Sequence, residues 1–263
     1  WGQKMGDAPM VDTLLGALND PFGNGHMGIT AENIATKWSI DRSTQDEIAL
    51  QSHLRAAQAR REGLFKEQIL PINVKCGRDT VVFDQDEHIR EDVTLEDLGK
   101  LRPAFKKDGS VTPGNASGIN DGAAALVMMS EGAAKKASIK PLARLIGYDH
   151  AAVDPSEMGI GPVPAVNRLL KKTGLSVSDM DVIESNEAFA AQACAVARDL
   201  EFPSHKTNPN GGAIALGHPV GATGAILTVK ALYELQRTGG RYGLITMCIG
   251  GGQGIAGIIE AVS

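Results

Sequence analysis

Apolar stretches of strand length alternate with amphipathic stretches of helix length from Gly118 to the end of the chain. The strands that this pattern predicts cover residues 122–129, 143–148, 181–184, 242–248 and 254–261, and the helices cover 131–137, 165–173, 189–200 and 225–236. Strands that alternate with helices are typical of an α/β sheet with helices on both faces. The stretches 122–129 and 254–261 resemble each other, which hints at an internal duplication.

The first 112 residues or so are more polar and less regular. We expect one helix from Thr30 to Trp38 and a second that begins with a capping box at residues 43–46 and stops at Gly63. Short extended pieces are predicted at 68–74 and 80–83. This part is interpreted as an irregular module of helices and loops that lies over the α/β part.

Composition excludes several classes of protein. No apolar run approaches the ~20 residues of a membrane helix, the start has no signal-peptide core, and a net charge of −5 argues against a nucleic-acid surface. The three cysteines, Cys76, Cys194 and Cys248, have neither metal-ligand spacing nor an even-numbered disulfide framework. We therefore predict that the protein has no metal site and that it is located in a reducing cytoplasm. The first residue is not Met, so we expect the interior of a longer chain.

The predicted strand 242–248 ends at Cys248, and Ile-Gly-Gly-Gly-Gln-Gly follows it. A buried cysteine is usually an inert apolar residue. Peptides without side chains, however, can approach a ligand closely and turn N–H groups toward it. We therefore predict a functional thiol at Cys248, whereas Cys194 is predicted to be a packing residue on a helix and Cys76 to be incidental.

His218 is the predicted nitrogen partner of this thiol. Gly217 precedes it, Pro219 fixes the backbone after it, and the loop leads into a helix. The alternative is a histidine that only bonds a neighbouring carbonyl. Four other histidines lie in polar surroundings and are expected to be solvated: His53, His88, His150 and His205.

Asn186 and Glu187 stand between a predicted strand and a predicted helix. Helix N-capping is the ordinary interpretation, but it explains one polar residue more easily than two. An asparagine at a strand end can also hold a water, and an ordered water is a good oxyanion donor. The stretch Asn208-Pro-Asn-Gly-Gly212 is compatible with a simple turn.

Three segments together resemble the C-terminal signatures of the thiolases. They are Asn186-Glu-Ala-Phe-Ala190, Gly212-Ala-Ile-Ala-Leu-Gly-His-Pro219 and Cys248-Ile-Gly-Gly-Gly-Gln-Gly254. His26-Met-Gly28, Asn115-Ala-Ser-Gly118 and Met158-Gly-Ile-Gly-Pro162 match the family pattern in the same order, so the resemblance covers essentially the whole chain. The residues of these motifs are most similar to those of bacterial biosynthetic-type thiolases, particularly broad-range β-ketothiolases.

The resemblance implies a thiolase-like α/β fold with a layered α-β-α-β-α core. Residues 1–117 would form a loop domain that binds coenzyme A and is partial at its start. Residues 118–139 would supply the final strand and helix of the N-terminal core domain, and residues 140–263 a complete C-terminal core domain.

The resemblance also implies an acyltransferase that catalyses reversible Claisen condensation and thiolysis between acyl-CoA, acetyl-CoA and 3-ketoacyl-CoA. His218 would activate the nucleophilic cysteine and, with a water held by Asn186, stabilise an oxyanion. Cys248 would be the acid/base that handles an α-proton, and the N–H near Gly250 would serve a second oxyanion. Two sets of residues would bind substrate: His26, Arg90, Phe105 and Ser117 along the coenzyme A tunnel, and Met27, Met158 and Phe189 near the acyl pocket.

No permanently bound cofactor is implied, because coenzyme A and acyl-CoA are substrates. A role in fatty acid metabolism, a homotetramer or dimer and a cytoplasmic location follow from the same resemblance. The family's nucleophilic cysteine lies upstream of the segments matched here, so a missing N-terminal segment is expected as a partner and the chain alone is expected to be inactive. Two alternatives remain open: an inactive, coenzyme A-binding thiolase-like module, and another thiolase-fold condensing enzyme such as a ketoacyl synthase.

Overall fold

The computed structural model describes residues 2 and 4–262 and centres on one four-stranded sheet. Its strands are β3 (Ala143–Ala152), β4 (Val182–Ser185), β5 (Tyr242–Ile249) and β6 (Gln253–Ala261), in the order β3-β6-β5-β4. β4 and β5 are parallel, and the other neighbours are antiparallel. The predicted final hairpin is confirmed, because β5 and β6 pair from Tyr242 with Glu260 to Ile249 with Gln253.

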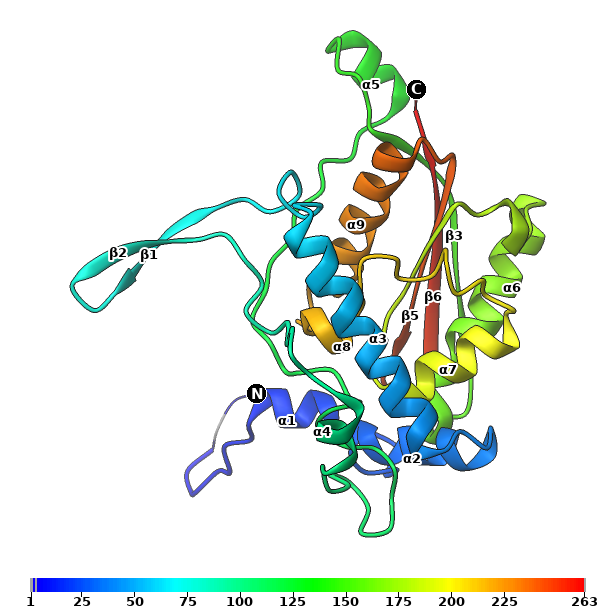
Figure 1. Ribbon diagram of the computed structural model, residues 1–263. Helices are drawn as coiled ribbons and strands as arrows, with labels where there is room; N and C mark the ends of the chain where they lie inside the picture. The colour runs from blue at the N-terminus through cyan, green and yellow to red at the C-terminus, as the bar shows by residue number, and fades with distance from the viewer. Residues whose placement is uncertain (1, 3, 263) are drawn as a thin grey trace.

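Helices cover both faces of this sheet, as the alternating pattern predicted (Figure 1). Neighbouring strand residues point to opposite faces, so Leu244 and Ile258 pack with α6 (Pro162–Thr173) and α7 (Ala190–Asp199), whereas Ile245 and Ile259 pack with α9 (Thr223–Thr238). Each face thus has its own apolar core. The helices predicted from residue 131 onward are all present, within three residues of their predicted ends.

Two further helices lie outside the α7 and α6 layer. α2 (Met27–Lys37) packs on α7 and on the 3-10 turn η1 (Pro155–Ile160), and α3 (Arg42–Arg61) packs on α7, α8 (Ala213–Leu216) and α4 (Leu95–Gly99). The predicted stop at Gly63 is confirmed by its left-handed φ of 71° just after the C-cap. Both predicted starts were wrong.

α2 and α3 begin earlier than their sequences suggested, because residues outside the predicted helices cap them. His26 Nδ1 accepts the N–H of Gly28 at 3.0 Å, which places Thr30 one turn inside α2. Asp41 accepts the N–H of Thr44 at 2.8 Å, so the segment 43–46 is already helical. A carboxylate or an imidazole nitrogen can satisfy a free N–H as well as the hydroxyl that the pattern favoured.

The strand predicted at residues 122–129 is absent from the structure, and with it the strand expected in the segment 118–139. Val127 and Met128 are 88% and 72% exposed. A strand needs a hydrogen-bonded neighbour, and among the described residues no strand reaches this segment. The similarity between 122–129 and 254–261 therefore has no counterpart here, since only the second stretch is a strand (β6).

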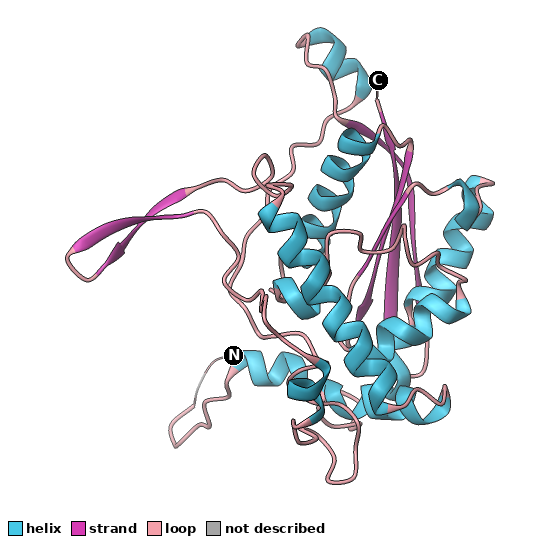
Figure 2. Ribbon diagram, viewed as in Figure 1, coloured by secondary structure: helices cyan, strands magenta, loops and turns pink. Residues whose placement is uncertain are grey.

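The remaining elements are short. β1 (Ile72–Cys76) and β2 (Asp79–Phe83) form an antiparallel hairpin that projects from the body (Figure 2). α1 (Thr13–Leu18), α5 (Glu131–Lys136) and the 3-10 turn η2 (Val177–Asp179) complete the described elements. None of the helices among residues 2 and 4–262 combines the length and the apolar character needed to cross a membrane.

Candidate active site

The carboxyl ends of β4 and β5 bring two of the predicted residues to one edge of the sheet. The strands are parallel, with Ser185 beside Thr246, so both end at the same edge. Asn186 continues this pairing, because its N–H donates to the carbonyl of Thr246 at 3.0 Å. Cys248 stands two residues further along β5.

Cys248 is buried in a small apolar cluster that the sequence had only partly predicted. The cluster contains Met27, Ala31, Val111, Ala116, Met158, Ala188, Phe189 and Cys248, and Phe105 packs against it. Burial raises the pKa of the Cys248 thiol to about 12. The side chain is therefore a neutral thiol near pH 7, which can donate a proton but is a poor resting nucleophile.

The glycines after Cys248 are required by close contacts and backbone geometry. A Cβ atom on Gly250 would lie 2.7 Å from the Met27 methyl group, and one on Gly252 would lie 2.3 Å from the carbonyl oxygen of Val153. Gly252 also has a φ of 85°, which disfavours other residues. The turn therefore brings bare peptide groups close to the apolar cluster around Cys248.

His218 reaches the same edge through Asn186. The Asn186 amide nitrogen lies 3.4 Å from His218 Nε2, and His218 Nδ1 lies 2.6 Å from the Thr223 hydroxyl. Thr223 donates its own proton to the carbonyl of Pro219 at 3.0 Å, so we assign the imidazole proton to Nδ1. Nε2 then keeps its lone pair, and burial lowers the pKa of His218, which favours this neutral form. His218 can act as a base at Nε2.

The alternative in which the His218 side chain only bonds a neighbouring carbonyl is wrong. Its ring nitrogens meet a hydroxyl and an amide. Its backbone N–H is the group that bonds carbonyl oxygens, those of Gly118 and of the Asn120 side chain, each at 3.3 Å. The capping interpretation of Asn186 and Glu187 is also wrong, because α7 starts at Ala190 without a side-chain cap.

Glu187 instead fixes the loop that leads to His218, a role that the sequence analysis missed. Its buried carboxylate accepts hydrogen bonds from Ser52 at 2.7 Å, from Asn208 at 2.8 Å and from the N–H of Ile214 at 3.3 Å. Asn208 also bonds both backbone groups of Ser185, at 2.9 and 2.8 Å, so the 208–212 stretch is more than a turn. The sequence feature that could have indicated this role is the pair of adjacent polar residues, Asn186 and Glu187, at the strand end.

The aromatic residues assigned to substrate binding pack together. The His26 ring stacks on Phe105 with centroids 4.8 Å apart, and Phe105 meets the edge of Phe189 at 6.0 Å. Ser117 donates from both its N–H and its hydroxyl to the carbonyl of Ala188, each at 3.0 Å. Three segments far apart in the sequence therefore meet beside the cluster that contains Cys248.

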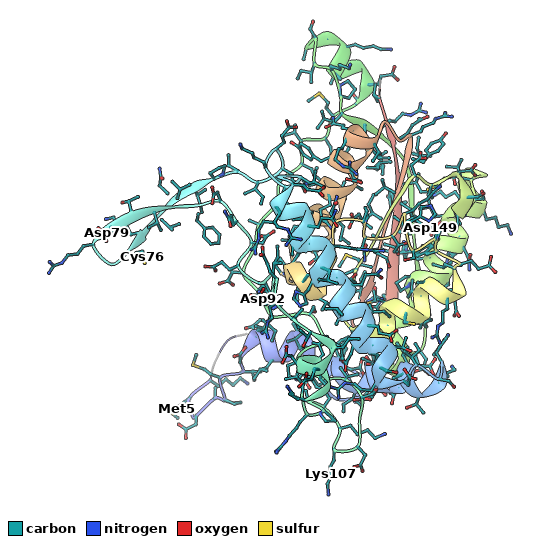
Figure 3. The ribbon with its side chains drawn as sticks, in the orientation of Figure 1. Met5, Cys76, Asp79, Asp92, Lys107 and Asp149 are labelled. Atoms are coloured by element: carbon teal, nitrogen blue, oxygen red, sulfur yellow. The ribbon has the colours of Figure 1, made fainter. Side chains whose placement is uncertain are left out.

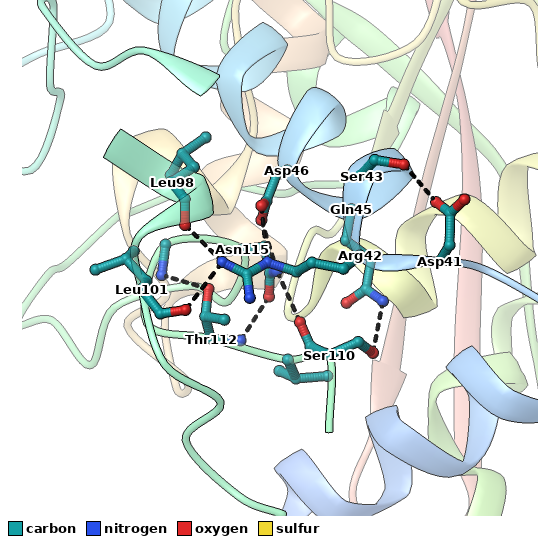
Figure 4. A network of polar contacts seen from close by, with 12 residues as sticks. Asp41, Arg42, Ser43, Gln45, Asp46, Leu98, Leu101, Ser110, Thr112 and Asn115 are labelled. Carbon is teal, nitrogen blue, oxygen red and sulfur yellow. Dashed lines mark hydrogen bonds and ion pairs between the residues drawn. The ribbon is translucent and has the colours of Figure 1, made fainter. Parts of the chain in front are cut away.

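A polar network holds the segment that carries Phe105 and Ser117 against α3 (Figure 4). Arg42 donates to the carbonyls of Leu98 and Leu101 at 2.5 and 3.1 Å and pairs with Asp46 at 2.7 Å. Asp46 in turn accepts from the Asn115 amide at 2.9 Å. A buried network of this kind fixes the position of a loop that has no regular secondary structure.

Arg90 does not join this group. Its N–H donates to His53 Nδ1 on α3 at 3.2 Å, and the neighbouring Ile89 packs in a different apolar cluster with Ala56, Phe65 and Ala215. The expectation that His53 is solvated was wrong, because only 3% of this residue is exposed. The residues that contact the His53 side chain come from the segment 88–90, which is distant from His53 in the sequence.

The other two cysteines lie elsewhere. Cys194 packs in the core between α6, α7 and the sheet, as predicted. Cys76 is exposed at the end of β1, at the tip of the projecting hairpin (Figure 3). Cys248 is therefore the one cysteine within residues 4–262 that belongs to the apolar cluster at the sheet edge where Asn186 lies.

Comparison with known proteins matches nearly the whole chain. A family model for the thiolase N-terminal domain covers residues 1–132, and one for the thiolase C-terminal domain covers residues 139–261. The beta-ketothiolase BktB of Cupriavidus necator is 60% identical over 263 residues, all of this chain and 67% of that protein. An acetyl-CoA acetyltransferase of Rhizobium meliloti is 52% identical over 260 residues, which are 98% of this chain and 66% of that protein.

Solved structures agree with the fold. The Bacillus anthracis acetyl-CoA acetyltransferase superposes with a TM-score of 0.94 and 50% identity over 100% of this chain and 66% of that one. The human mitochondrial 3-ketoacyl-CoA thiolase in complex with CoA gives a TM-score of 0.90 and 47% identity, again over 100% of this chain and 66% of that one. The chain spans about two thirds of the length of these relatives. It has the α/β thiolase fold, and it belongs to the thiolase family.

Proposed function

We propose that this chain supplies the base, the acid and groups of both oxyanion sites of a thiolase that interconverts 3-ketoacyl-CoA plus coenzyme A with acyl-CoA plus acetyl-CoA. The observation that carries the proposal is the arrangement at the sheet edge. A neutral histidine with an unprotonated Nε2 faces the amide of Asn186, at the end of the strand beside the one that carries the buried thiol of Cys248. The names of the relatives support the same reaction class.

The roles follow from the protonation states. In thiolysis, His218 Nε2 removes the proton of a nucleophilic thiol, whose sulfur attacks the keto carbon of 3-ketoacyl-CoA. The bond between C2 and C3 breaks, and the electron pair forms the enolate of acetyl-CoA. Cys248, a neutral thiol, donates its proton to C2 of this enolate.

Exchange of protons with solvent returns His218 to its neutral form and Cys248 to its thiol. In the second half, His218 removes the proton of the coenzyme A thiol, and the coenzyme A sulfur attacks the acyl-enzyme. The bond between the acyl carbon and the nucleophile's sulfur breaks, and His218 returns its proton to that sulfur.

Asn186 is proposed to support the oxyanion through a bound water. Its amide nitrogen faces His218, whereas its Oδ1 is buried and makes no hydrogen bond to any described residue. A buried carbonyl of this kind is a suitable partner for a water. The bare peptides near Gly250 are proposed to serve the second oxyanion.

We place the nucleophilic cysteine outside these 263 residues, in the third of the relatives' length that the chain does not match. Cys76 and Cys194 are both unsuitable, since one lies on an exposed hairpin and the other in the core. The proposed divisions are a loop domain (1–117), the end of an N-terminal core domain (118–139) and a C-terminal core domain (140–263). Fatty acid metabolism, a cytoplasmic location and a homotetramer or dimer complete the proposal.

The substrate would lie along the cluster of apolar and aromatic side chains. Met27, Met158 and Phe189 surround Cys248 and are proposed to contact the acyl group. His26, Phe105 and Ser117 lie next to them, and these three residues and Arg90 are proposed to line the coenzyme A tunnel. Coenzyme A enters and leaves as a substrate, so no permanently bound cofactor is proposed.

The test is thiolysis of acetoacetyl-CoA, measured through the loss of the absorbance of its enolate. A protein of the relatives' full length that contains these residues is expected to turn over, and the 263-residue chain alone is expected to show no rate above background. A full-length protein without thiolysis would contradict the proposed function. Comparable turnover by the chain alone would contradict the placement of the nucleophile.

Thr223 provides a finer test of the assigned tautomer. Thr223→Val keeps the shape of the side chain but removes the oxygen that accepts from His218 Nδ1. Loss of one buried hydrogen-bond partner costs about 1–3 kcal/mol, so kcat is expected to fall about tenfold or more. Thr223→Ser keeps the hydroxyl and is the matched control. Equal kcat values for the valine and serine variants would show that Thr223 does not set the tautomer.

A further inference from the structure

Two stacked histidines lie between the segment that carries Arg90 and the loop that carries His218. His53 is on α3 and is almost fully buried, and His88 is half-buried. Their ring centroids are 6.4 Å apart, and their planes differ by 19°. None of the roles proposed above uses either side chain.

His53 holds the backbone of Arg90. The N–H of Arg90 donates to His53 Nδ1 at 3.2 Å, so this nitrogen must be unprotonated. Burial first, and then electrostatic interaction with His88 and Arg90, lower the pKa of His53 to about 4. The ring is therefore a stable neutral acceptor at any pH near 7.

His88 contacts the segments next to the loop that carries His218. Its Nδ1 lies 3.1 Å from the carbonyl oxygen of Ala215, which can only accept, so Nδ1 carries the proton. Ala215 belongs to α8, which ends two residues before His218. His88 also packs tightly on Gly118, since a Cβ atom there would lie 2.4 Å from His88 Nε2. The carbonyl of Gly118 accepts the backbone N–H of His218 at 3.3 Å.

We infer that His53 and His88 are positioning residues that couple the coenzyme A-binding segment at Arg90 to the loop of the catalytic His218. A hydrogen bond links His53 on α3 to the backbone of Arg90. Two residues earlier in the same segment, His88 bonds Ala215 and packs against Gly118. A displacement of the segment at residues 88–90 would therefore also displace the loop that carries His218, and the reverse holds. This inference rests on the proposed function, because Arg90 is assigned to coenzyme A there.

The kinetic test uses the full-length enzyme and two substitutions of His53. His53→Leu removes the acceptor of the Arg90 N–H, and the KM for coenzyme A in thiolysis is expected to rise about tenfold with a smaller change in kcat. His53→Gln restores a neutral acceptor and is expected to recover most of the affinity. His205→Gln, at an exposed histidine, is the matched control and is expected to leave both constants unchanged.

A double-mutant cycle separates positioning from general damage. If His53 acts through Arg90, the KM increases of His53→Leu and Arg90→Ala are expected to be strongly non-additive. KM effects that multiply independently would overturn the inference. So would a His53→Leu variant that loses kcat while its KM stays unchanged.

Hydrogen exchange provides a readout that does not depend on activity. In His53→Leu, amide exchange is expected to accelerate both around residues 88–90 and around residues 213–218, and His88→Phe is expected to do the same. Acceleration confined to residues 88–90 would show that the two segments are not coupled. Coupled exchange in a protein that neither binds coenzyme A nor cleaves acetoacetyl-CoA would support the coupling and contradict the proposed function.

Discussion

Replacing His218 with alanine in the full-length enzyme is expected to lower both half-reactions of thiolysis by about 100- to 1,000-fold, the usual effect of removing one oxyanion donor or general base. His218 Nε2 is the unprotonated nitrogen at the sheet edge, because Nδ1 carries the proton toward Thr223 and burial favours the neutral ring. The same nitrogen would deprotonate the nucleophile in the first half and coenzyme A in the second. Stopped-flow measurement of acylation and of deacylation by coenzyme A checks each half.

His150→Ala is the matched control for this experiment, because His150 lies on an exposed part of β3. Its two half-reactions are expected to stay at the wild-type rate. Circular dichroism and the thermal midpoint of the His218→Ala protein establish that it is folded. A folded His218→Ala variant that still acylates at the wild-type rate would show that another group activates the nucleophile.

The sequence predicted the sheet correctly wherever a strand finds its partner within the chain. β5 and β6 are joined by a turn that glycines dictate, so their pairing is local. β4 and β5 are distant in sequence, yet apolar runs between helices were sufficient to predict both. The stretch 122–129 has the same apolar composition and is no strand, because composition cannot supply a hydrogen-bonding neighbour.

The site could be predicted to the extent that its residues end strands or begin helices. Asn186 follows β4, Cys248 lies near the end of the neighbouring parallel strand β5, and the structure places both at one edge. Met27, Met158, Phe189 and Phe105 also meet around Cys248. Arg90 is different, because its position is set by His53 through a contact that spans 37 residues.

The roles of buried polar residues were the least predictable. Glu187 bonds Ser52, which is 135 residues away, and no local pattern encodes such a pair. His53 has polar neighbours in sequence, and yet the packing of α3 against residues 88–90 buries it. Local sequence reports on turns and periodicity, whereas burial of a polar group depends on distant segments that satisfy its hydrogen bonds.

Replacing Cys248 with alanine is expected to separate the two chemical events that the site supports. The acyl-enzyme should still form from acetyl-CoA, because its formation needs His218 and the nucleophile but no proton at carbon. Exchange of the α-protons of the bound acetyl group should fall at least about 100-fold, since that step requires the acid/base group. Trapping with labelled acetyl-CoA measures acylation, and deuterium wash-in at the methyl group measures exchange.

The protonation state of Cys248 makes this outcome specific. With a pKa of about 12, the buried thiol can donate a proton to an enolate and take one back, but it offers almost no thiolate to attack a carbonyl at neutral pH. Cys76→Ala, at the exposed hairpin cysteine, is the control and should retain both events. If Cys248→Ala cannot be acylated but still exchanges deuterium, the assignment is inverted, and Cys248 is itself the nucleophile.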